Sequence, residues 1–405
     1  MSRQADEGWV SSQRLRLMRQ RSTEYLPLVI AAALLALSVA VRLANRTVIT
    51  TDLDFHILPW YAKLQKFGPL VGLGKDFYNY TPPYLYLLAL GTLTSELMAP
   101  VTAVKLISTA FDLYCAYVIY RIVRLKYLDG YLPVLAAAVF FAAPTIMANS
   151  GIWGQADSTY TSFLLTSLYF LLVQRPVPAV LFFGISLAFK PQAIFVAPFL
   201  LLMLLWRRIP WWSIATIPAV YVVLMWPAVF FGRTWTEVLT IYSDQAGSGK
   251  GFTHNAPNLF VFVPKVGFDR WIGPIVVLAI GVALAWVVLS WWQSRTTDRA
   301  ELLLLALVSV ELVPFLLPNM HDRYFYLADT LSIVLAFMMP EVWFIALLFQ
   351  LVSGLSYSIY LYSASPDNLV LAAAINVLTL VVLLVRQSMI NGRTGARHRH
   401  EVSTE

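Results

Sequence analysis

The chain has 405 residues, of which 59% are hydrophobic and only 13% carry a charge. This composition excludes a soluble globular protein, because too few polar side chains are present to cover the surface of one. The net charge of +7 does not indicate nucleic-acid binding, because the basic residues lie between apolar runs, as topology signals do. The chain is therefore predicted to be an all-α, polytopic membrane protein whose first partner is the lipid bilayer. Its single cysteine, Cys115, excludes an intrachain disulfide and a site built from several thiolates.

The first predicted element is a retained signal anchor, because Arg14, Arg16, Arg19 and Arg21 precede the apolar run Leu26–Ala44 and no small-residue cleavage site follows. Later apolar runs bring the prediction to about twelve spans, most of them long enough for a bilayer core of about 30 Å. The predicted spans are 27–45, 103–123, 131–149, 158–173, 177–190, 192–206, 210–231, 271–292, 300–317, 323–339, 341–361 and 367–386.

The segment Pro82–Met98 decides the predicted orientation. If it crossed the bilayer, the cluster Arg121/Arg124/Lys126 would lie opposite the basic N-terminus, against the positive-inside tendency. We therefore expect a juxtamembrane helix on the outer side. The remaining basic loops then share the side of the N-terminus, which predicts an integral plasma (inner) membrane protein with both termini cytoplasmic.

The predicted domain organisation is simple. Residues 1–387 form one transmembrane domain, and residues 388–405 form a basic, disordered cytoplasmic tail. Two long loops, 46–102 and 232–270, lie on the outer, extracytoplasmic side. Within 177–206, about 29 residues predict two half-length helices, because Pro191 in Phe189-Lys190-Pro191-Gln192 cannot continue a regular helix. A break at membrane depth faces protein or a wet cavity, so Lys190 is expected to point into one.

The first outer loop carries Asp52 and Asp54 directly after the first span. A carboxylate at this place is costly unless it is used, and near a cation it can act as a general base toward a hydroxyl. Asp52 and His56 lie four residues apart and can share a helix face. The alternative is that Asp52 only caps a helix or pairs with a nearby lysine.

A second cluster reads Trp153-Gly154-Gln155-Ala156-Asp157-Ser158. Trp153 offers an aromatic plane for a sugar, and Gln155 with Asp157 offers acceptors for its hydroxyls. In the simpler alternative, Asp157 and Ser158 cap the next helix.

Two further segments favour phosphate binding. Lys190 and Gln192 lie at the helix break, where a lysine must be paired or bound to an anion. His321 and Arg323 follow a later span and could complete a phosphate clamp, because a guanidinium forks onto phosphate oxygens. Alternatively, Arg323 only pairs with Asp322.

No metal or other cofactor is predicted, because no HxxxH or HExxH spacing occurs. A divalent ion held by His56, His254, His321, Asp52 and Asp157 stays open as an alternative.

Several segments taken together, in chain order, resemble the GT-C superfamily of membrane glycosyltransferases. They are the acidic first loop, Tyr80-Thr81-Pro82-Pro83-Tyr84, the 153–158 cluster, Phe189-Lys190-Pro191-Gln192, Asn255-Ala256-Pro257-Asn258-Leu259 and Met320-His321-Asp322-Arg323-Tyr324-Phe325. The chain looks most similar to prokaryotic relatives of the mannosyltransferases of glycolipid-anchor synthesis. It looks more loosely like the dolichol-phosphate-glucose-dependent glucosyltransferases of the endoplasmic reticulum.

The resemblance implies a GT-C-like bundle that transfers one sugar, with inversion, from a polyprenyl-phosphate-linked donor to a glycan or glycolipid hydroxyl. By its distance to Pro59-Trp60, Asp52 matches the family's catalytic base, with Asp54 as a supporting residue. Lys190, His321 and Arg323 match positions near the lipid phosphate, and Asp157 matches one near the sugar or acceptor. Tyr80, Asn255 and Asn258 lie in matching segments and are expected to bind substrate. Thr51 stands where family members often have glycine.

Two other classes also fit about twelve spans with buried charges. One is a secondary transporter and the other is a flippase of lipid-linked sugars. A transporter is disfavoured because the polar clusters gather on one predicted face, and a flippase gives no reason for Asp52.

Overall fold

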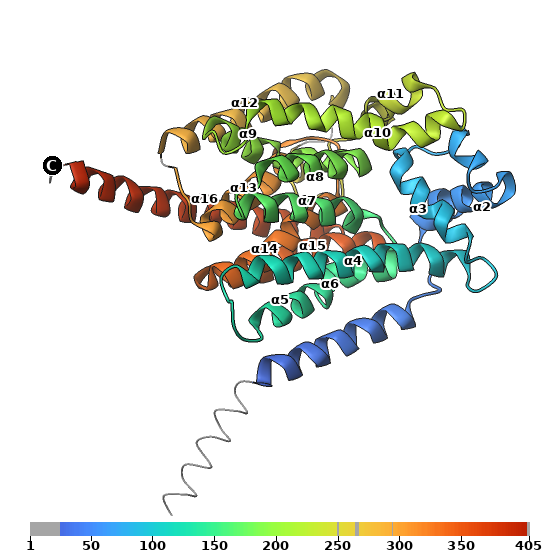
Figure 1. The fold of residues 1–405 in the computed structure, drawn as a ribbon, viewed down its shortest axis with the longest axis horizontal. Coiled ribbons are helices and arrows are strands. Elements are labelled where there is room, and N and C mark those ends of the chain that lie inside the picture. The colour runs from blue at the N-terminus through green and yellow to red at the C-terminus, as the bar shows by residue number, and fades with distance from the viewer. Residues whose placement is uncertain (1–24, 249–250, 264–266, 294, 403–405) are drawn as a thin grey trace, which may run out of the picture.

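In the computed structural model, residues 25–248, 251–263, 267–293 and 295–402 are described, and the arginines predicted to precede the first span lie outside them. Helices dominate the described chain (Figure 1). The first half contains a helix over Tyr25–Ala44, η1 (Leu53–Ile57), α2 (Leu58–Phe67), η2 (Val71–Gly74), α3 (Pro82–Thr92), α4 (Pro100–Arg124), α5 (Leu132–Phe141), α6 (Pro144–Ile146), η3 (Met147–Trp153), α7 (Asp157–Leu172), α8 (Pro176–Phe189), η4 (Pro191–Val196) and α9 (Ala197–Leu205). The second half contains η5 (Trp211–Ala215), α10 (Thr216–Phe230), α11 (Trp235–Ser248), β1 (Thr253–His254), η6 (Leu259–Phe262), α12 (Phe268–Gln293), α13 (Arg299–Leu316), β2 (Met320–His321), η7 (Asp322–Phe325), α14 (Tyr326–Met338), η8 (Pro340–Val342), α15 (Phe344–Tyr362) and α16 (Asp367–Val402).

Local sequence explains where several helices begin. Proline occupies the first turn of α3, α4, α5 and α8, where its missing N–H costs nothing. Asp298 caps α13, since its carboxylate accepts from the backbone N–H groups of Ala300 and Glu301 at 2.9 and 3.0 Å. The helix starts are thus set by ordinary proline and capping chemistry.

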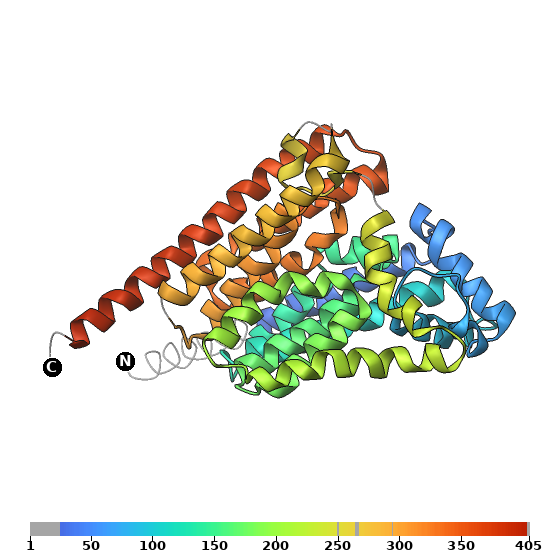
Figure 2. The same ribbon diagram turned by 90° about the horizontal axis from the view of Figure 1, so that it is seen from above.

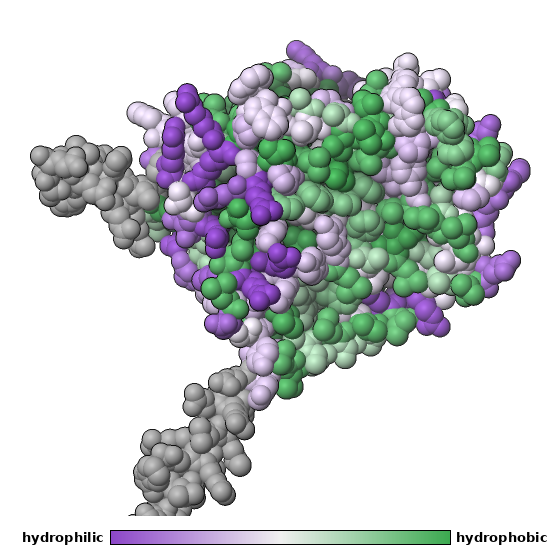
Figure 3. Space-filling model, viewed as in Figure 1, coloured by the Kyte–Doolittle hydropathy of each residue, from purple (hydrophilic) through white to green (hydrophobic). Residues whose placement is uncertain are grey.

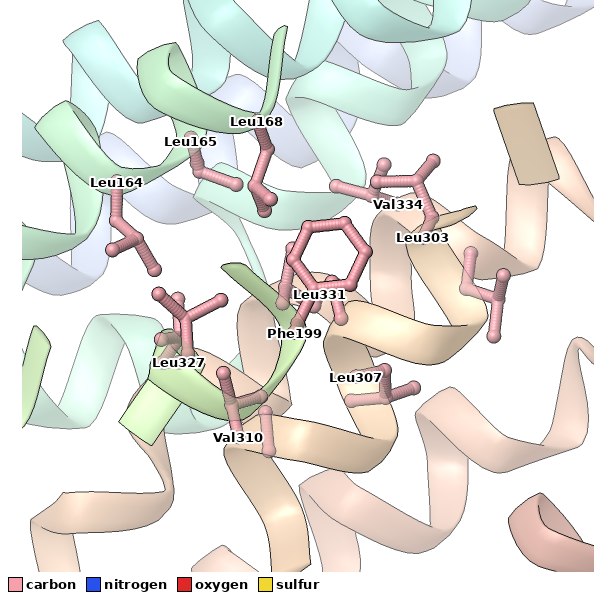
Figure 4. Packing of buried hydrophobic residues seen from close by; sticks show 14 of the residues in the cluster. Leu164, Leu165, Leu168, Phe199, Leu303, Leu307, Val310, Leu327, Leu331 and Val334 are labelled. Carbon is pink, nitrogen blue, oxygen red and sulfur yellow. The ribbon is translucent and has the colours of Figure 1, made fainter. Parts of the chain in front are cut away.

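The main hydrophobic core lies between α7, α9, α13 and α14 (Figure 4). The leucine, valine and phenylalanine side chains drawn there come from all four helices: Leu164, Leu165, Leu168, Phe199, Leu303, Leu307, Val310, Leu327, Leu331 and Val334. A second core, around Tyr61, Leu64 and Leu85, joins α2 to α3 and fixes the first loop as a folded unit. The loops between the two cores are therefore held in place by the helices on either side.

Six helices in the described residues are long and apolar enough to cross a membrane, or seven if the bent pair Leu132–Phe141 and Pro144–Trp153 is one span. The prediction of an all-α membrane protein is confirmed, but the count of about twelve crossings is not. The difference arises because several predicted spans are short in the structure. Helix α7 has 16 residues, α8 has 14, α9 has 9 and α14 has 13. Apolar runs built from such helices pack inside the bundle and are not distinguished from spans by hydropathy alone.

The surface has the pattern expected of a membrane protein. Figure 3 shows hydrophobic side chains over the middle of the molecule, with hydrophilic ones gathered near the end where α16 leaves the bundle. Figure 2 shows α16 continuing past the other helices toward the C-terminus. The tail predicted to be disordered from residue 388 is therefore helical as far as Val402.

Two predictions about irregular segments agree with the structure. Helix α3 has 11 residues and spans only about 17 Å at 1.5 Å per residue, too short to cross a bilayer. The helix break is also present, since α8 ends at Phe189, Lys190 is extended with φ −151° and ψ 141°, and η4 begins at Pro191. These segments lie at the same end of the bundle as the first loop, and there they border the site.

Candidate active site

A cavity of about 470 Å³ lies where several loops meet at one end of the bundle. Its walls come from η1, from η3 and the turn after it, from the paired strands β1 and β2, and from the end of α15. Seven residues singled out from the sequence line it: Asp52, Tyr80, Trp153, Gln155, Asn255, His321 and Arg323. Segments separated by up to 308 positions in the chain are thus brought to one space.

Asp52 is held by three side-chain donors, all on one oxygen. Its Oδ2 accepts from Trp153 Nε1 at 3.0 Å, from Gln155 Nε2 at 2.8 Å and from Arg323 Nη1 at 3.4 Å. Its Oδ1 accepts from none of these. The carboxylate is 25% exposed, so it is oriented by the protein and still reaches the cavity. Asp52 does not act as a helix cap, because its side chain makes no cap hydrogen bond to η1. It does not pair with a lysine either, because its ion-pair partner is Arg323.

Tyr360, on α15, completes the setting of Asp52. Its hydroxyl oxygen accepts from the backbone N–H of Asp52 at 2.8 Å, and its ring stacks on Trp153 with centroids 4.5 Å apart. The Arg323 guanidinium carbon lies 5.7 Å from the same indole ring. Trp153 therefore contacts Asp52 and two of the other residues that hold it, Tyr360 and Arg323.

A smaller cavity of about 140 Å³ adjoins the first and is lined by Lys190, Gln192 and Tyr324. The two cavities share four lining residues: Asn79, Tyr80, His321 and Arg323. Lys190 is 5% exposed and pairs with the fully buried Asp157 at 2.7 Å. Asp157 also accepts from Asn149 Nδ2 at 3.0 Å. Asp157 therefore supports Lys190 and does not cap α7, whose N-cap is Ala156 without a side-chain hydrogen bond.

His321 is held on the short parallel ladder formed by β1 and β2, opposite His254. The two imidazoles stack with centroids 4.7 Å apart, and His254 Nε2 lies 2.8 Å from Asn319 Oδ1. Burial, with Arg323 and His254 nearby, lowers the pKa of His321 to about 3. His321 is thus a neutral imidazole at ordinary pH and can donate a hydrogen bond without adding a charge.

Asp322 and Arg323 are neighbours but do not form the predicted alternative ion pair. Asp322 Oδ1 accepts from the backbone N–H of Arg323 at 2.9 Å, whereas the guanidinium reaches Asp52. Burial raises the pKa of Asp322 to about 7. Because its guanidinium contacts Asp52 and not Asp322, the Arg323 side chain is directed to the cavity.

Three predicted site residues line neither cavity: Asp157, which pairs with Lys190, and Asp54 and Asn258. Asp54 is exposed and is absent from the lining of both cavities. Asn258 is fully buried, caps η6 and donates to the carbonyl of Leu317 at 3.1 Å, which makes it a structural residue of the long loop. Because an asparagine in a loop can cap a turn or bind a ligand, the sequence did not distinguish the two roles.

A divalent ion would require several candidate ligands to lie close together. Within the described residues, no three His, Cys, Asp or Glu side chains are grouped as metal ligands. His56 and His254 line the larger cavity with Asp52, but Asp157 is engaged by Lys190. That the reaction needs no metal stays a prediction.

The cavity also contains residues that the sequence reasoning missed. Tyr360 lies in an apolar run near its end, and a tyrosine there is typical of a membrane interface, so no signal set it apart. Asn79 lies in the first outer loop, 46–102, and lines both cavities, but its position before Tyr80 carried no chemistry of its own. Asn319 lines neither cavity but holds His254, and its positive φ of 62° is a turn feature that the sequence Pro-Asn indicates only weakly.

An apolar helical bundle with an oriented carboxylate, and with an adjoining cavity bordered by two cations, has the features of a membrane-bound enzyme. The particular class follows from comparison with known proteins. The model of glycosyltransferase family 87 matches residues 78–318. Because the match covers more than half of the chain, the protein belongs to this family and is a glycosyltransferase. Family 87 is of the GT-C type, so the superfamily predicted from the sequence is confirmed.

Proposed function

We propose that this glycosyltransferase moves a single sugar from a polyprenyl-phosphate-linked donor to a hydroxyl of a glycan or glycolipid acceptor, with inversion at the anomeric carbon. The observation that carries the proposal is the pair of adjoining cavities. One contains a carboxylate suited to a general base, the other is bordered by cations suited to a phosphate, and Arg323 lines both.

Asp52 is the general base in this proposal. Its Oδ2 is occupied by Trp153, Gln155 and Arg323, which leaves Oδ1 to receive a proton. A base must lie within hydrogen-bond reach of the proton it removes, and a carboxylate fixed by three donors is preorganised for this. An acceptor hydroxyl in the larger cavity would meet it there.

The smaller cavity suits the donor phosphate. Lys190 and Arg323 supply charge there, while Gln192 and the neutral His321 can supply hydrogen bonds. In the resting site Lys190 and Arg323 are balanced by Asp157 and Asp52. A phosphate diester carries one negative charge, and the ammonium and guanidinium groups can both donate hydrogen bonds to its oxygens.

The reaction is then a single displacement. As the acceptor oxygen attacks the anomeric carbon, its proton passes to Asp52 and the bond from that carbon to the phosphate oxygen breaks. The leaving polyprenyl phosphate takes the electron pair and is stabilised by Lys190 and Arg323. Attack from the face opposite the leaving group inverts the anomeric configuration.

The decisive experiment is a transfer assay of the purified full chain with a panel of polyprenyl-phosphate sugars, with and without a chelator. Asp52→Asn is expected to lower the transfer rate by about 10³-fold, as loss of a general base does, and to leave donor binding intact. Asp54→Asn, the neighbouring exposed carboxylate, is expected to have a much smaller effect. Full activity of Asp52→Asn would refute the assignment of the base. Loss of activity on chelation would show a metal requirement.

The site is further proposed to face the extracytoplasmic side, because Arg121, Arg124 and Lys126 lie at the opposite end of α4 from the first loop. The only native cysteine, Cys115, is fully buried and should stay unlabelled. In intact cells, Asp54→Cys is expected to react with a membrane-impermeant maleimide, while Leu128→Cys, 75% exposed at the other end, reacts only after permeabilisation. The reverse pattern would overturn the orientation.

A further inference from the structure

One seven-residue π-helical segment, η3, makes a hydrogen bond to each of three aspartates from different elements. Trp153 donates to Asp52, Asn149 donates to Asp157, and the hydroxyl of Ser150 donates to Asp112 on α4. The first two aspartates belong to the proposed site. The third lies inside the bundle, outside the lining of either site cavity.

Asp112 is fully buried and forms an ion pair with Arg42, on the Tyr25–Ala44 helix, at 2.7 Å. Its other oxygen, Oδ1, accepts from the Tyr326 hydroxyl at 3.1 Å. Arg42 also donates to the Phe141 carbonyl at 3.0 Å. A buried ion pair inside an apolar bundle is costly to desolvate, so its presence is weak evidence of a gain in stability. The contacts that it makes with η3 point to a role in orientation.

Arg42 also contacts η3 directly. Its Nη2 lies 3.4 Å from Ser150 Oγ, and a Cβ added at Gly151 would come within 2.9 Å of Arg42 Cγ. The side chain of Arg42 is therefore packed onto the backbone of η3 at Gly151. The close approach requires glycine at this position.

We propose that Arg42 and Asp112 are positioning residues for the sugar-transfer reaction. They fix η3 through Ser150 and Gly151, and η3 in turn fixes Asp52 through Trp153 and Asp157 through Asn149. The inference rests on the proposed function in that Asp52 is taken as the base. Neither Arg42 nor Asp112 touches substrate.

The physical need for such a support comes from η3 itself. π-Helical turns are rare, and they occur mostly as single turns at functional sites, where the surrounding packing must hold them. A displacement of about 1 Å in a catalytic group can cost about 10²-fold in rate. A hydrogen-bonded ion pair behind η3 prevents such a displacement.

A double-mutant cycle between Ser150→Ala and Trp153→Phe tests this. Each single variant is expected to lower kcat about 10-fold, the size of one hydrogen bond to a charged group. If Ser150 acts through Trp153, the double variant loses little more than either single one, because the second change removes an orientation already lost. An additive loss of about 100-fold, or an unchanged kcat in Ser150→Ala, would overturn the proposal.

Ser167→Ala is the matched control, because its buried hydroxyl donates to the Ala179 carbonyl at 2.7 Å away from η3. It is expected to leave kcat unchanged and to combine additively with Trp153→Phe. If Ser150→Ala does not fold, Tyr326→Phe removes only the donor to Asp112 Oδ1, and it is expected to lower kcat about 3-fold with the same non-additivity. An unchanged kcat in a folded Tyr326→Phe would also count against the proposal.

The outcome for Asp52 separates the two hypotheses. If Asp52→Asn is inactive and the Ser150 cycle is additive, the positioning role fails while the general base stands. If Asp52→Asn is active, the general base fails, and the positioning role, which acts through that base, fails with it.

Discussion

The two ends of the bundle each carry a cavity lined by charged residues, and the larger cavity is not at the candidate site. The cavity around Asp52 has about 470 Å³, whereas the one bordered by Lys126, Arg299 and Arg386 at the opposite end has about 1200 Å³. In the cavity at the opposite end, the cations hold helix ends together. Lys126 donates to the Met338 carbonyl at 2.9 Å, Arg299 donates to the Leu125 carbonyl at 2.8 Å, and Arg386 pairs with Glu341.

In the cavity around Asp52, the charged side chains line the open space instead. Arg323 reaches Asp52 at the long distance of 3.4 Å and lines both parts of the site, and Lys190 lines the adjoining part. The volume of a cavity therefore does not locate the chemistry. What distinguishes the site is a carboxylate, Asp52, that three side chains orient at a cavity adjoined by a second one lined by Lys190 and Arg323.

The sharpest test of this contrast compares two arginines. Arg323→Met is expected to lower kcat by about 10²- to 10³-fold, because charge that builds on the leaving phosphate loses its partner. Arg299→Met, in the cavity at the opposite end of the bundle, is expected to keep normal transfer. Single-turnover rates of both variants with the same donor provide the measurement. Equal losses in the two would mean that the charge convergence around Asp52 has no special role.

The two lysines give the next largest effect. Lys190→Met is expected to weaken donor binding about 100-fold, since a charge-assisted contact to phosphate is lost, while Lys126→Met leaves it unchanged. Because Lys190→Met also leaves Asp157 buried without its partner, stability falls as well. The pair Asp157→Asn with Lys190→Met is expected to recover the melting temperature but not donor affinity. Recovery of both would make Lys190 purely structural.

A smaller effect is expected at Tyr360. Tyr360→Phe keeps the stack on Trp153 and removes the hydroxyl that accepts from the Asp52 backbone N–H, so kcat should fall about 5-fold. Tyr362→Phe, two residues further on and 66% exposed, is the control. A KM change without a kcat change would contradict a role in orienting the base.

The smallest effect concerns pH and stability. The folded pKa of His321 is lowered to about 3, whereas an unfolded histidine takes up a proton near 6.5. The stability that a neutral His321 contributes is therefore complete above pH 6.5 and is lost as the pH falls toward 3. At pH 5 the loss is about 2 kcal/mol, so wild-type protein should lose more melting temperature between pH 7.5 and 5 than His321→Asn does.

The opposite shift at Asp322 does not obscure this comparison. Its pKa is raised to about 7, so its contribution is present below about pH 4 and is lost as the pH rises through 7. Asp322 is present in both proteins, and the difference between them isolates His321. Identical pH dependence in wild type and His321→Asn would show that His321 takes up its proton normally.

Sequence reasoning worked best where a polar residue is rare in its surroundings. Asp52, Lys190 and Arg323 adjoin apolar runs, and a charge at such a place requires a partner, so each could be identified without coordinates. Their actual partners could not be identified, because nothing in spacing relates Asp52 to a guanidinium 271 positions away. The family match from 78 to 318 likewise leaves out both Asp52 and Arg323.

The residues missed by the sequence are polar groups inside apolar helices. Arg42 and Asp112 occur in predicted spans where neither has a neighbour at helical spacing that explains it. Tyr360 is one of several tyrosines near the end of its helix. Each acquires a role only from the element packed against it. The count of about twelve crossings is not confirmed for a related reason. Short helices inside the bundle and lipid-exposed spans have the same composition.

By itself, the sequence determined the membrane class, the helical fold, the break at Lys190 and the superfamily, because these depend on composition and on local chemistry such as the proline at 191. The tertiary structure alone decided that Asp52 is set by Trp153, Gln155 and Arg323, that Asp157 is the partner of Lys190, and that Asp54 and Asn258 lie outside the cavities. Hydrogen bonds and ion pairs depend on distances of about 3 Å between side chains, and only the packing of distant helices sets those distances.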